Sequence, residues 1–261
     1  MIRYFLEVAY KGTKYSGFQV QENAITVQSE IERALEILLR SGVRLTGSSR
    51  TDSGVHALQN YFHFDTEEEI SERKLYNINS LLPDDIVVKC LHKMKPKNNG
   101  ALPHARFDAT SRKYKYFILQ RKDPFKKDTS FYFPYKLDFE LLQQAALVIK
   151  AYTDFTSFSK RNTQVKTYNC SILESEWKIE NEMFIYHVRS NRFLRGMVRA
   201  LVGTMLQVGR KKISIDKFHE IINARDCSLA DFSAPAQGLF LITVEFPEDF
   251  FSVKSAPDEH F

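Results

Sequence analysis

The sequence is poor in cysteine, glycine and proline, and each scarcity excludes a class of protein. The three cysteines, Cys90, Cys170 and Cys227, lie far apart in a chain of 261 residues. That pattern argues against a disulfide framework and a zinc knuckle, and it fits a reducing cytoplasm. The 10 glycines and 8 prolines fall below the averages of about 7% and 5%. Collagen-like, low-complexity and disordered classes are therefore excluded.

A signal peptide and a membrane span are not expected either. The first eight residues hold a short apolar run that Glu7 interrupts, and no small-residue cleavage site follows. The longest apolar stretch, residues 197–208, contains Arg199 and is shorter than the roughly 20 residues that cross a bilayer. We expect a cytoplasmic protein with no membrane partner.

Aromatic residues and an uneven distribution of charge are what the sequence does have. It contains 21 Phe, 12 Tyr and 1 Trp, and its net charge is +5. Residues 89–127 carry a net +10 and residues 187–212 a net +7, which leaves −12 for the rest of the chain. Clustered cations attract polyanions, and phosphate neutralisation supplies much of the affinity for nucleic acid. The charges are equally compatible with a scatter over solvated faces. Residues 112–117, however, alternate cations with aromatic rings. Such rings can stack on unpaired bases, and the same alternation is typical of a strand with one core face.

Hydrophobic periodicity predicts an α+β fold made of two similar halves. The first half has the order strand, helix, strand, strand, helix, strand, which is the split βαβ pattern. Thr26 and Asp138 are the expected N-caps of two helices. A polar connector at residues 95–100 separates domains 1–100 and 101–261, with a cleft between them. The expected strands are 2–10, 43–49, 58–65, 85–94, 112–120, 168–179, 183–191 and 239–246, and the expected helices are 26–40, 71–82, 139–151, 194–208 and 215–224.

The segment most informative about chemistry is residues 47–57, Gly-Ser-Ser-Arg-Thr-Asp-Ser-Gly-Val-His-Ala, between two expected strands. By themselves, Asp52-Ser53-Gly54 are typical of a turn and Arg50 of a surface charge. His56 has no partner His or Cys at the spacing of a metal site. A phosphate-binding glycine loop and a Gly-x-Ser-x-Gly nucleophile elbow are both absent. The residue types alone favour a surface turn over a catalytic loop.

In this segment the chain resembles the TruA-type tRNA pseudouridine synthases, whose motif is Gly-Arg-Thr-Asp-Ala-Gly-Val-His-Ala. Residues 50–52 and 54–57 match it, whereas Ser49 and Ser53 stand where the family usually has Gly and Ala. Both serines are small, so we expect the loop to tolerate them. Similar motifs follow in the family's order over nearly the whole chain, at residues 10–21, 26–28, 79–86, 104–116, 154–158, 191–199 and 234–241.

The resemblance implies a pseudouridine synthase fold with mainly antiparallel sheets, and a homodimer. It implies that the protein isomerises uridine to pseudouridine in the anticodon stem-loop of tRNA, at tRNA positions 38, 39 or 40, without metal or cofactor. The family's catalytic aspartate maps to Asp52 in the first half. Its base-stacking tyrosine maps to Tyr114, and the arginine partner of the carboxylate to Arg199, both in the second half. The motif arginine, Arg50, completes the catalytic set, and the other expected substrate-binding residues are His56, Lys113, Arg192 and Arg195.

These residue types suit the reaction. A carboxylate can act as nucleophile or base without a metal while an N-glycosidic bond breaks and the base is rejoined through carbon. We predict that Arg199 pairs with Asp52, since a neighbouring guanidinium favours an ionised carboxylate. A stacked uridine must first be extruded, at a cost of a few kcal/mol, and stacking on Tyr114 returns roughly 1–3 kcal/mol. The residues leave open whether Asp52 attacks the base, attacks the sugar or removes a proton.

Two other functions stay open from the residues. A non-catalytic RNA-binding or tRNA-folding protein could use the same scaffold, although it has no need of Asp52, Tyr114 and Arg199 together. A hydrolase with an aspartate nucleophile, acting on a small phosphorylated molecule, would need metal ligands that the spacing does not provide. Arg192 stands where the family often has a small residue, so the resemblance does not fix the range of substrates.

Overall fold

The computed structural model describes residues 1–71, 73–161 and 165–251. The predicted helix over 71–82 and the predicted half over 101–261 therefore include residues that lie outside the described ones. Mixed α and β structure confirms the predicted class. The strands are β1 (Ile2–Tyr10), β2 (Thr46–Gly47), β3 (His56–Thr66), β4 (Ile86–Lys93), β5 (Ser111–Leu119), β6 (Phe131–Tyr132), β7 (Ile172–Glu180), β8 (Met183–Ser190) and β9 (Leu239–Glu245).

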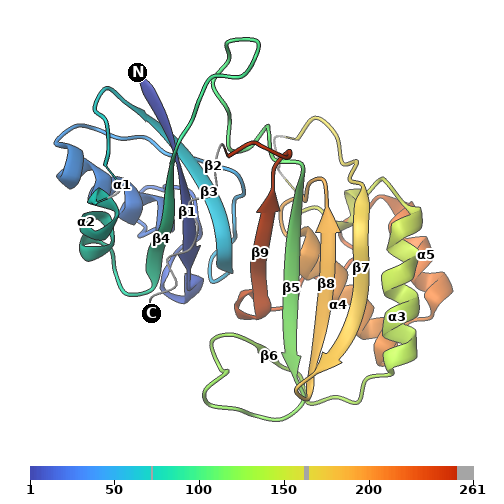
Figure 1. Ribbon diagram of the computed structural model, residues 1–261. Helices are drawn as coiled ribbons and strands as arrows, with labels where there is room; N and C mark the ends of the chain where they lie inside the picture. The colour runs from blue at the N-terminus through green and yellow to red at the C-terminus, as the bar shows by residue number, and fades with distance from the viewer. Residues whose placement is uncertain (72, 162–164, 252–261) are drawn as a thin grey trace.

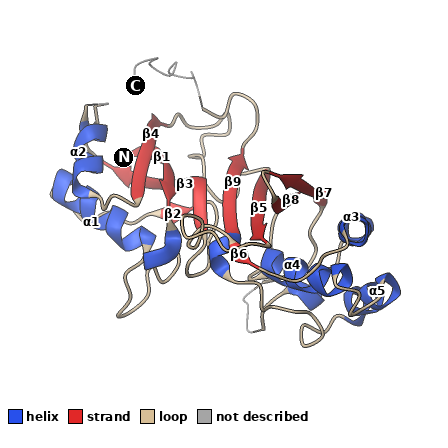
Figure 2. Cartoon of the chain, turned by 90° about the horizontal axis from the view of Figure 1, so that it is seen from below, coloured by secondary structure: helices blue, strands red, loops and turns tan. Residues whose placement is uncertain are grey.

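Both halves contribute to one mainly antiparallel sheet, whose main path runs β4-β1-β3-β9-β5-β8-β7 (Figure 1). Figure 2 shows the helices of both halves on the same side of this sheet. In the part of the chain that the structure describes, no helix has the length and hydropathy needed to cross a bilayer. The helices are α1 (Val27–Leu39), α2 (Lys74–Leu81), α3 (Phe139–Val148), α4 (Met197–Gly209) and α5 (Ile215–Ala224).

Helix α1 begins where the sequence predicts, at the N-cap Thr26. The Thr26 side chain accepts a hydrogen bond from the Ser29 backbone N–H at 3.1 Å, and Ser29 Oγ accepts one from the Thr26 N–H at 3.0 Å. This reciprocal pair satisfies two N–H groups that the first turn otherwise leaves open. The apolar face of the helix is buried in the core, and it comprises Val27, Ile31, Ala34, Leu35 and Leu39.

The strand predicted at residues 43–49 is much shorter, because only Thr46 and Gly47 pair with β3. The backbone N–H of Leu45 donates to Glu32 of α1 at 2.8 Å, and that of Val43 donates to Glu36 at 3.4 Å. These side-chain acceptors take the place of a strand partner. Residues 43–45 therefore bind the helix instead of extending the sheet.

The last strand, β9, joins the two halves. It runs parallel to β3, with His56 opposite Phe240, and antiparallel to β5, with Tyr114 opposite Leu241. Because β3 and β9 are parallel, their amino-terminal ends lie at the same edge of the sheet. The loop before β3, which carries Asp52, therefore lies beside the segment that enters β9.

Strand β5 has one core face, as its alternation predicts. Tyr114, Tyr116 and Ile118 are buried on that face, whereas Lys113 and Lys115 on the other face are half-exposed. Successive side chains of a strand point to opposite faces, so this pattern decides which residues can meet the Asp52 loop. Most of the aromatic excess lies in the core, as the sequence analysis expects of rings at alternating positions.

Candidate active site

A buried polar network holds the loop that carries Asp52. Asn60 is fully buried, and its amide donates to the Tyr10 hydroxyl at 3.2 Å and to the Ser49 carbonyl at 3.1 Å. The Tyr10 hydroxyl lies 2.8 Å from Thr51 Oγ1. Burial raises the pKa of Tyr10 to about 12, so this hydroxyl stays protonated at neutral pH. The network fixes the backbone immediately before Asp52.

Two glycines allow the amino-terminal segment to pack against the same loop. Gly17 has a φ of +93°, and a Cβ there would lie 3.0 Å from the Thr51 carbonyl oxygen. Phe18 then donates its backbone N–H to that oxygen at 3.1 Å. At Gly12, a Cβ would lie only 2.0 Å from the Val55 carbonyl oxygen. The family motif at residues 10–21 thus supplies the wall of the Asp52 loop.

Arg199 lies beside Asp52, as predicted. It belongs to the first turn of α4, and its Nη1 is 3.8 Å from Asp52 Oδ2. Its Nε donates to the Ala234 carbonyl at 2.6 Å, which holds the guanidinium in place. The Asp52 side chain is 27% exposed and that of Arg199 is 19% exposed. The pair is therefore reachable from solvent, and the carboxylate can contact a substrate.

Tyr114 lies next to this pair on the core face of β5. Burial raises the pKa of the Tyr114 phenol, with smaller contributions from Tyr10 and the negative charge of Asp52. The Tyr114 ring meets Phe193 edge to face, with their centroids 5.0 Å apart. The phenol is therefore neutral, and the ring is held beside Asp52 by an aromatic neighbour.

Arg112 is a structural anchor that the sequence analysis missed. It is 8% exposed, and its guanidinium donates to the carbonyl groups of Ala109, Asn191, Ser48 and Arg106 at 2.9–3.2 Å. These bonds tie the start of the Asp52 loop to two segments of the second half. The sequence did contain a signal for this role. Arg112 is two residues before Tyr114 and shares its core face of β5, where a buried cation needs hydrogen-bond partners.

Three arginines, Arg50, Arg106 and Arg192, form a group that we call the arginine rim. Burial lowers the pKa of Arg106, and the positive charges of Arg50 and Arg192 lower it further. None of them forms an ion pair with any residue that the structure describes. Arg106 also lies over the ring of Phe107, at 5.8 Å from its centroid, and that ring is 75% exposed.

Two of the predicted substrate-binding residues are engaged by other groups of the protein. His56 is 1% exposed; its Nδ1 accepts from the Gly12 N–H at 3.1 Å and its Nε2 lies 3.2 Å from the Gln237 carbonyl. Burial lowers its pKa, which favours the neutral ring that these two contacts require. Lys113 is on the opposite face of β5 from Tyr114, and its ammonium pairs with Glu174 at 2.7 Å. Arg195, by contrast, is exposed two residues before α4.

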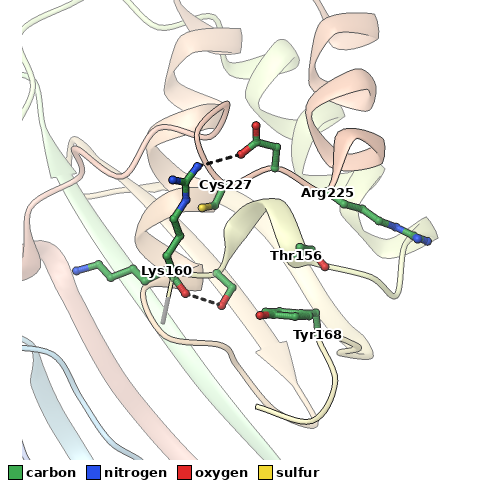
Figure 3. A pocket seen from close by; sticks show the side chains of 8 residues that line it. Thr156, Lys160, Tyr168, Arg225 and Cys227 are labelled. Carbon is green, nitrogen blue, oxygen red and sulfur yellow. Dashed lines mark hydrogen bonds and ion pairs between the residues drawn. The ribbon is translucent and has the colours of Figure 1, made fainter. Parts of the chain in front are cut away.

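Two cavities flank the site without including Asp52, Tyr114 or Arg199 in their described linings. One, of about 200 Å³, lies beside η3 (Thr156–Phe158) and the end of α5 (Figure 3). Its cations are largely paired, because Arg161 lies 3.6 Å from Asp226 and Arg225 lies 3.0 Å from Asp154. The other, of about 370 Å³, borders the Asp52 loop and is lined by Thr13, Ser53, Gly54, Lys127, Asp128, Ala236 and Gln237.

Comparison with known proteins decides the family. The profile described as tRNA pseudouridine synthase matches residues 152–247. A Parabacteroides distasonis protein named tRNA pseudouridine synthase A is 45% identical, over 97% of this chain and 100% of that protein. The chain belongs to the tRNA pseudouridine synthase family.

Two further tRNA pseudouridine synthases A have similar coverage. The Bacteroides fragilis protein is 44% identical over 95% of this chain and 98% of its own length, and that of an Exiguobacterium species is 38% identical over 94% and 98%. The family profile covers Arg199 but neither Asp52 nor Tyr114, whereas the alignments to these tRNA pseudouridine synthases span nearly the whole chain. The predicted family is confirmed.

Proposed function

We propose that this protein isomerises uridine to pseudouridine in tRNA, with Asp52 as the reacting carboxylate. The observation that carries the proposal is the solvent-accessible pair of Asp52 and Arg199 beside the neutral ring of Tyr114. The names of its relatives favour this isomerase over a non-catalytic RNA-binding protein. Asp52, Tyr114 and Arg199 come from three separate elements, and a binder has no need to bring them together.

The reaction needs no change in oxidation state. The bond between N1 of uracil and C1′ of the ribose breaks, and a bond between C5 of uracil and C1′ forms. C5 loses its proton, and N1 gains one. We assign to Asp52 the contact with the reacting nucleoside, as nucleophile or base. Arg199 pairs with the carboxylate and orients it, and its own bond to the Ala234 carbonyl holds the guanidinium in place. Tyr114 stacks on the extruded base, which keeps the freed uracil from leaving.

The remaining site residues divide into positioning and binding roles. We assign His56 a positioning role, since its ring bonds link the backbone of Gly12 to that of Gln237. Arg50, Arg192 and Arg195 are assigned to the tRNA backbone, because solvent-accessible cations with no acidic partner among the described residues are available for phosphates. Lys113 can bind tRNA only where the RNA also reaches the second face of β5, on which this side chain lies.

The finer expectations of the family resemblance belong to the same proposal. Residues 1–100 would carry the Asp52 loop, and residues 101–261 would carry Tyr114 and Arg199. The substrate would be the anticodon stem-loop, at tRNA positions 38, 39 or 40. The protein would act in the cytoplasm as a homodimer, and its reaction would use neither metal nor cofactor.

Incubation with a panel of unmodified tRNAs tests the proposed function. We expect new pseudouridine in the anticodon stem-loop, mapped by carbodiimide labelling and primer extension, with chelator present throughout. tRNAs that carry cytidine at the same positions are the matched control and should stay unmodified. Binding of these tRNAs without any new pseudouridine would instead support the non-catalytic alternative.

Charge neutralisation tests the path of the RNA. The double variant Arg192→Gln/Arg195→Gln should bind tRNA more weakly, and the slope of log affinity against log salt should fall by about one for each phosphate that is no longer neutralised. Lys178→Gln is the matched control, because Lys178 pairs with Glu176 at 2.8 Å on the distant strand β7. An unchanged slope in the double variant would place the RNA elsewhere, and a reduced slope in Lys113→Gln would extend its path to the second face of β5.

A further inference from the structure

A second cluster of reactive side chains lies on β1 and β4, the two neighbouring strands of the first half. Glu7 of β1 is opposite Cys90 of β4 in the antiparallel register. His92 follows Cys90 by two residues, so both side chains lie on the same face of β4. One ligand atom from each of the three residues lies within 4.8 Å of the other two. The proposed isomerisation uses none of these residues.

One side-chain nitrogen of this cluster has no hydrogen-bond partner among the described residues. His92 Nε2 is buried and has no hydrogen-bond partner within the described residues. Leaving a buried polar atom unpaired costs free energy, so such an atom calls for an explanation. The Glu7 carboxylate accepts a hydrogen bond from the Tyr61 hydroxyl at 2.8 Å. A carboxylate with one such bond keeps lone pairs for a cation, and outer hydrogen bonds of this kind orient metal ligands.

Aromatic rings enclose the cluster on one side. The Phe251 ring centroid is 4.6 Å from that of His92 and 5.1 Å from that of Tyr61. The ring of Phe5, which shares the face of β1 with Glu7, lies 5.9 Å from Phe251.

We propose that Glu7, Cys90 and His92 bind one Zn²⁺ ion, with water as the fourth ligand. Carboxylate, thiolate and imidazole are all zinc ligands, and three protein ligands with one water form an established tetrahedral arrangement. The donor atoms must close in until each lies about 2.0–2.3 Å from the ion. When the bond from Cys90 Sγ to zinc forms, the thiol releases its proton to solvent and nothing is oxidised or reduced.

Spacing along the chain explains why the sequence analysis predicts no metal. Cys90 and His92 lie two residues apart, but Glu7 belongs to a strand that only the fold brings alongside them. The cluster shares no residue with the Tyr10, Asn60 and Thr51 network behind Asp52. We therefore assign the ion to the stability of the first half, and the proposal of metal-independent catalysis is unaffected.

Cobalt titration tests the site without any RNA. Protein freed of metal by a chelator and titrated with Co²⁺ should develop a thiolate-to-cobalt charge-transfer band that saturates at one ion per chain. Zn²⁺ should displace the cobalt, abolish the band and raise the melting temperature. Cys90→Ser should lose both the band and the zinc-dependent rise, while Cys227→Ser, a half-buried cysteine outside the cluster, should keep both.

A second variant changes the imidazole and keeps the thiolate. His92→Gln should bind Co²⁺ at least about tenfold more weakly, because it loses one of the three protein ligands. Thermal unfolding of each metal-free variant shows whether it is folded before cobalt is added. No saturable band in the parent protein, or an equal band in Cys90→Ser, would refute the zinc site. Because pseudouridine formation is not part of the readout, neither result bears on the proposed isomerase activity.

Discussion

Asp52→Asn abolishes pseudouridine formation in our expectation, with a fall in kcat of about 10³-fold or more. The amide has nearly the shape of the carboxylate but neither its charge nor its nucleophilic and basic oxygen. The side chain is partly exposed, and its ion pair with Arg199 spans 3.8 Å, so its loss costs the fold about 1 kcal/mol at most. The variant should therefore fold and bind tRNA. Release of tritium from carbon 5 of labelled uridine in tRNA measures the rate.

A second aspartate provides the matched control for this variant. Asp123 lies in the loop between β5 and β6 and pairs with Lys126 at 3.7 Å. Asp123→Asn should keep full activity. Turnover of Asp52→Asn within about tenfold of the parent, an increase of only about 1.4 kcal/mol in the activation barrier, would remove Asp52 from the reaction.

Arg199→Gln should lower kcat by about 10²-fold, the scale seen when one preorganised electrostatic partner is removed from an active site. Glutamine can keep a hydrogen bond to the Ala234 carbonyl but supplies no positive charge to Asp52. Arg199→Lys should recover part of the rate, because it restores the positive charge. The recovery should be incomplete, because a single ammonium nitrogen cannot replace the two guanidinium nitrogens that contact Ala234 and Asp52. Single-turnover rates at saturating enzyme separate this effect from tRNA affinity.

Arg210 offers the control for Arg199 on the same helix. It lies at the C-cap of α4, where its guanidinium is 3.8 Å from the centroid of the Tyr135 ring. Arg210→Gln should leave the single-turnover rate unchanged. If Arg199→Gln lost only tRNA affinity and kept its single-turnover rate, Arg199 would be an RNA ligand instead of the partner of Asp52.

Local patterns predicted most of the elements well. The N-cap at Thr26, the helix at 215–224 and the alternation of β5 depend on contacts between residues a few positions apart, and each is present in the structure. The strand expected at 43–49 is the main exception. Glu32 and Glu36 are four residues apart on one face of α1, and the sequence does not reveal that they accept the backbone N–H groups of that segment.

The site was predicted in part. Motif resemblance indicated Asp52, Tyr114 and Arg199, and the structure brings these three side chains together. Arg112 was missed as an anchor, because four carbonyl groups from distant segments define its role. His56 was expected to bind substrate, yet its burial between Gly12 and Gln237 supports a positioning role. Alternation along β5 signals that Arg112 is buried, but no local pattern identifies its carbonyl partners or those of His56.

The sequence by itself determined the family, the loop that carries Asp52 and the core face of β5. Only the tertiary structure decided that β9 runs parallel to β3, and this pairing brings residues 234–238 beside the Asp52 loop. It also decided that the Ala234 carbonyl is the group that holds Arg199 beside Asp52, a pairing that the sequence already predicted. The physical reason is range: capping and alternation act within one element, whereas strand order and buried charge depend on which distant segments exclude water together.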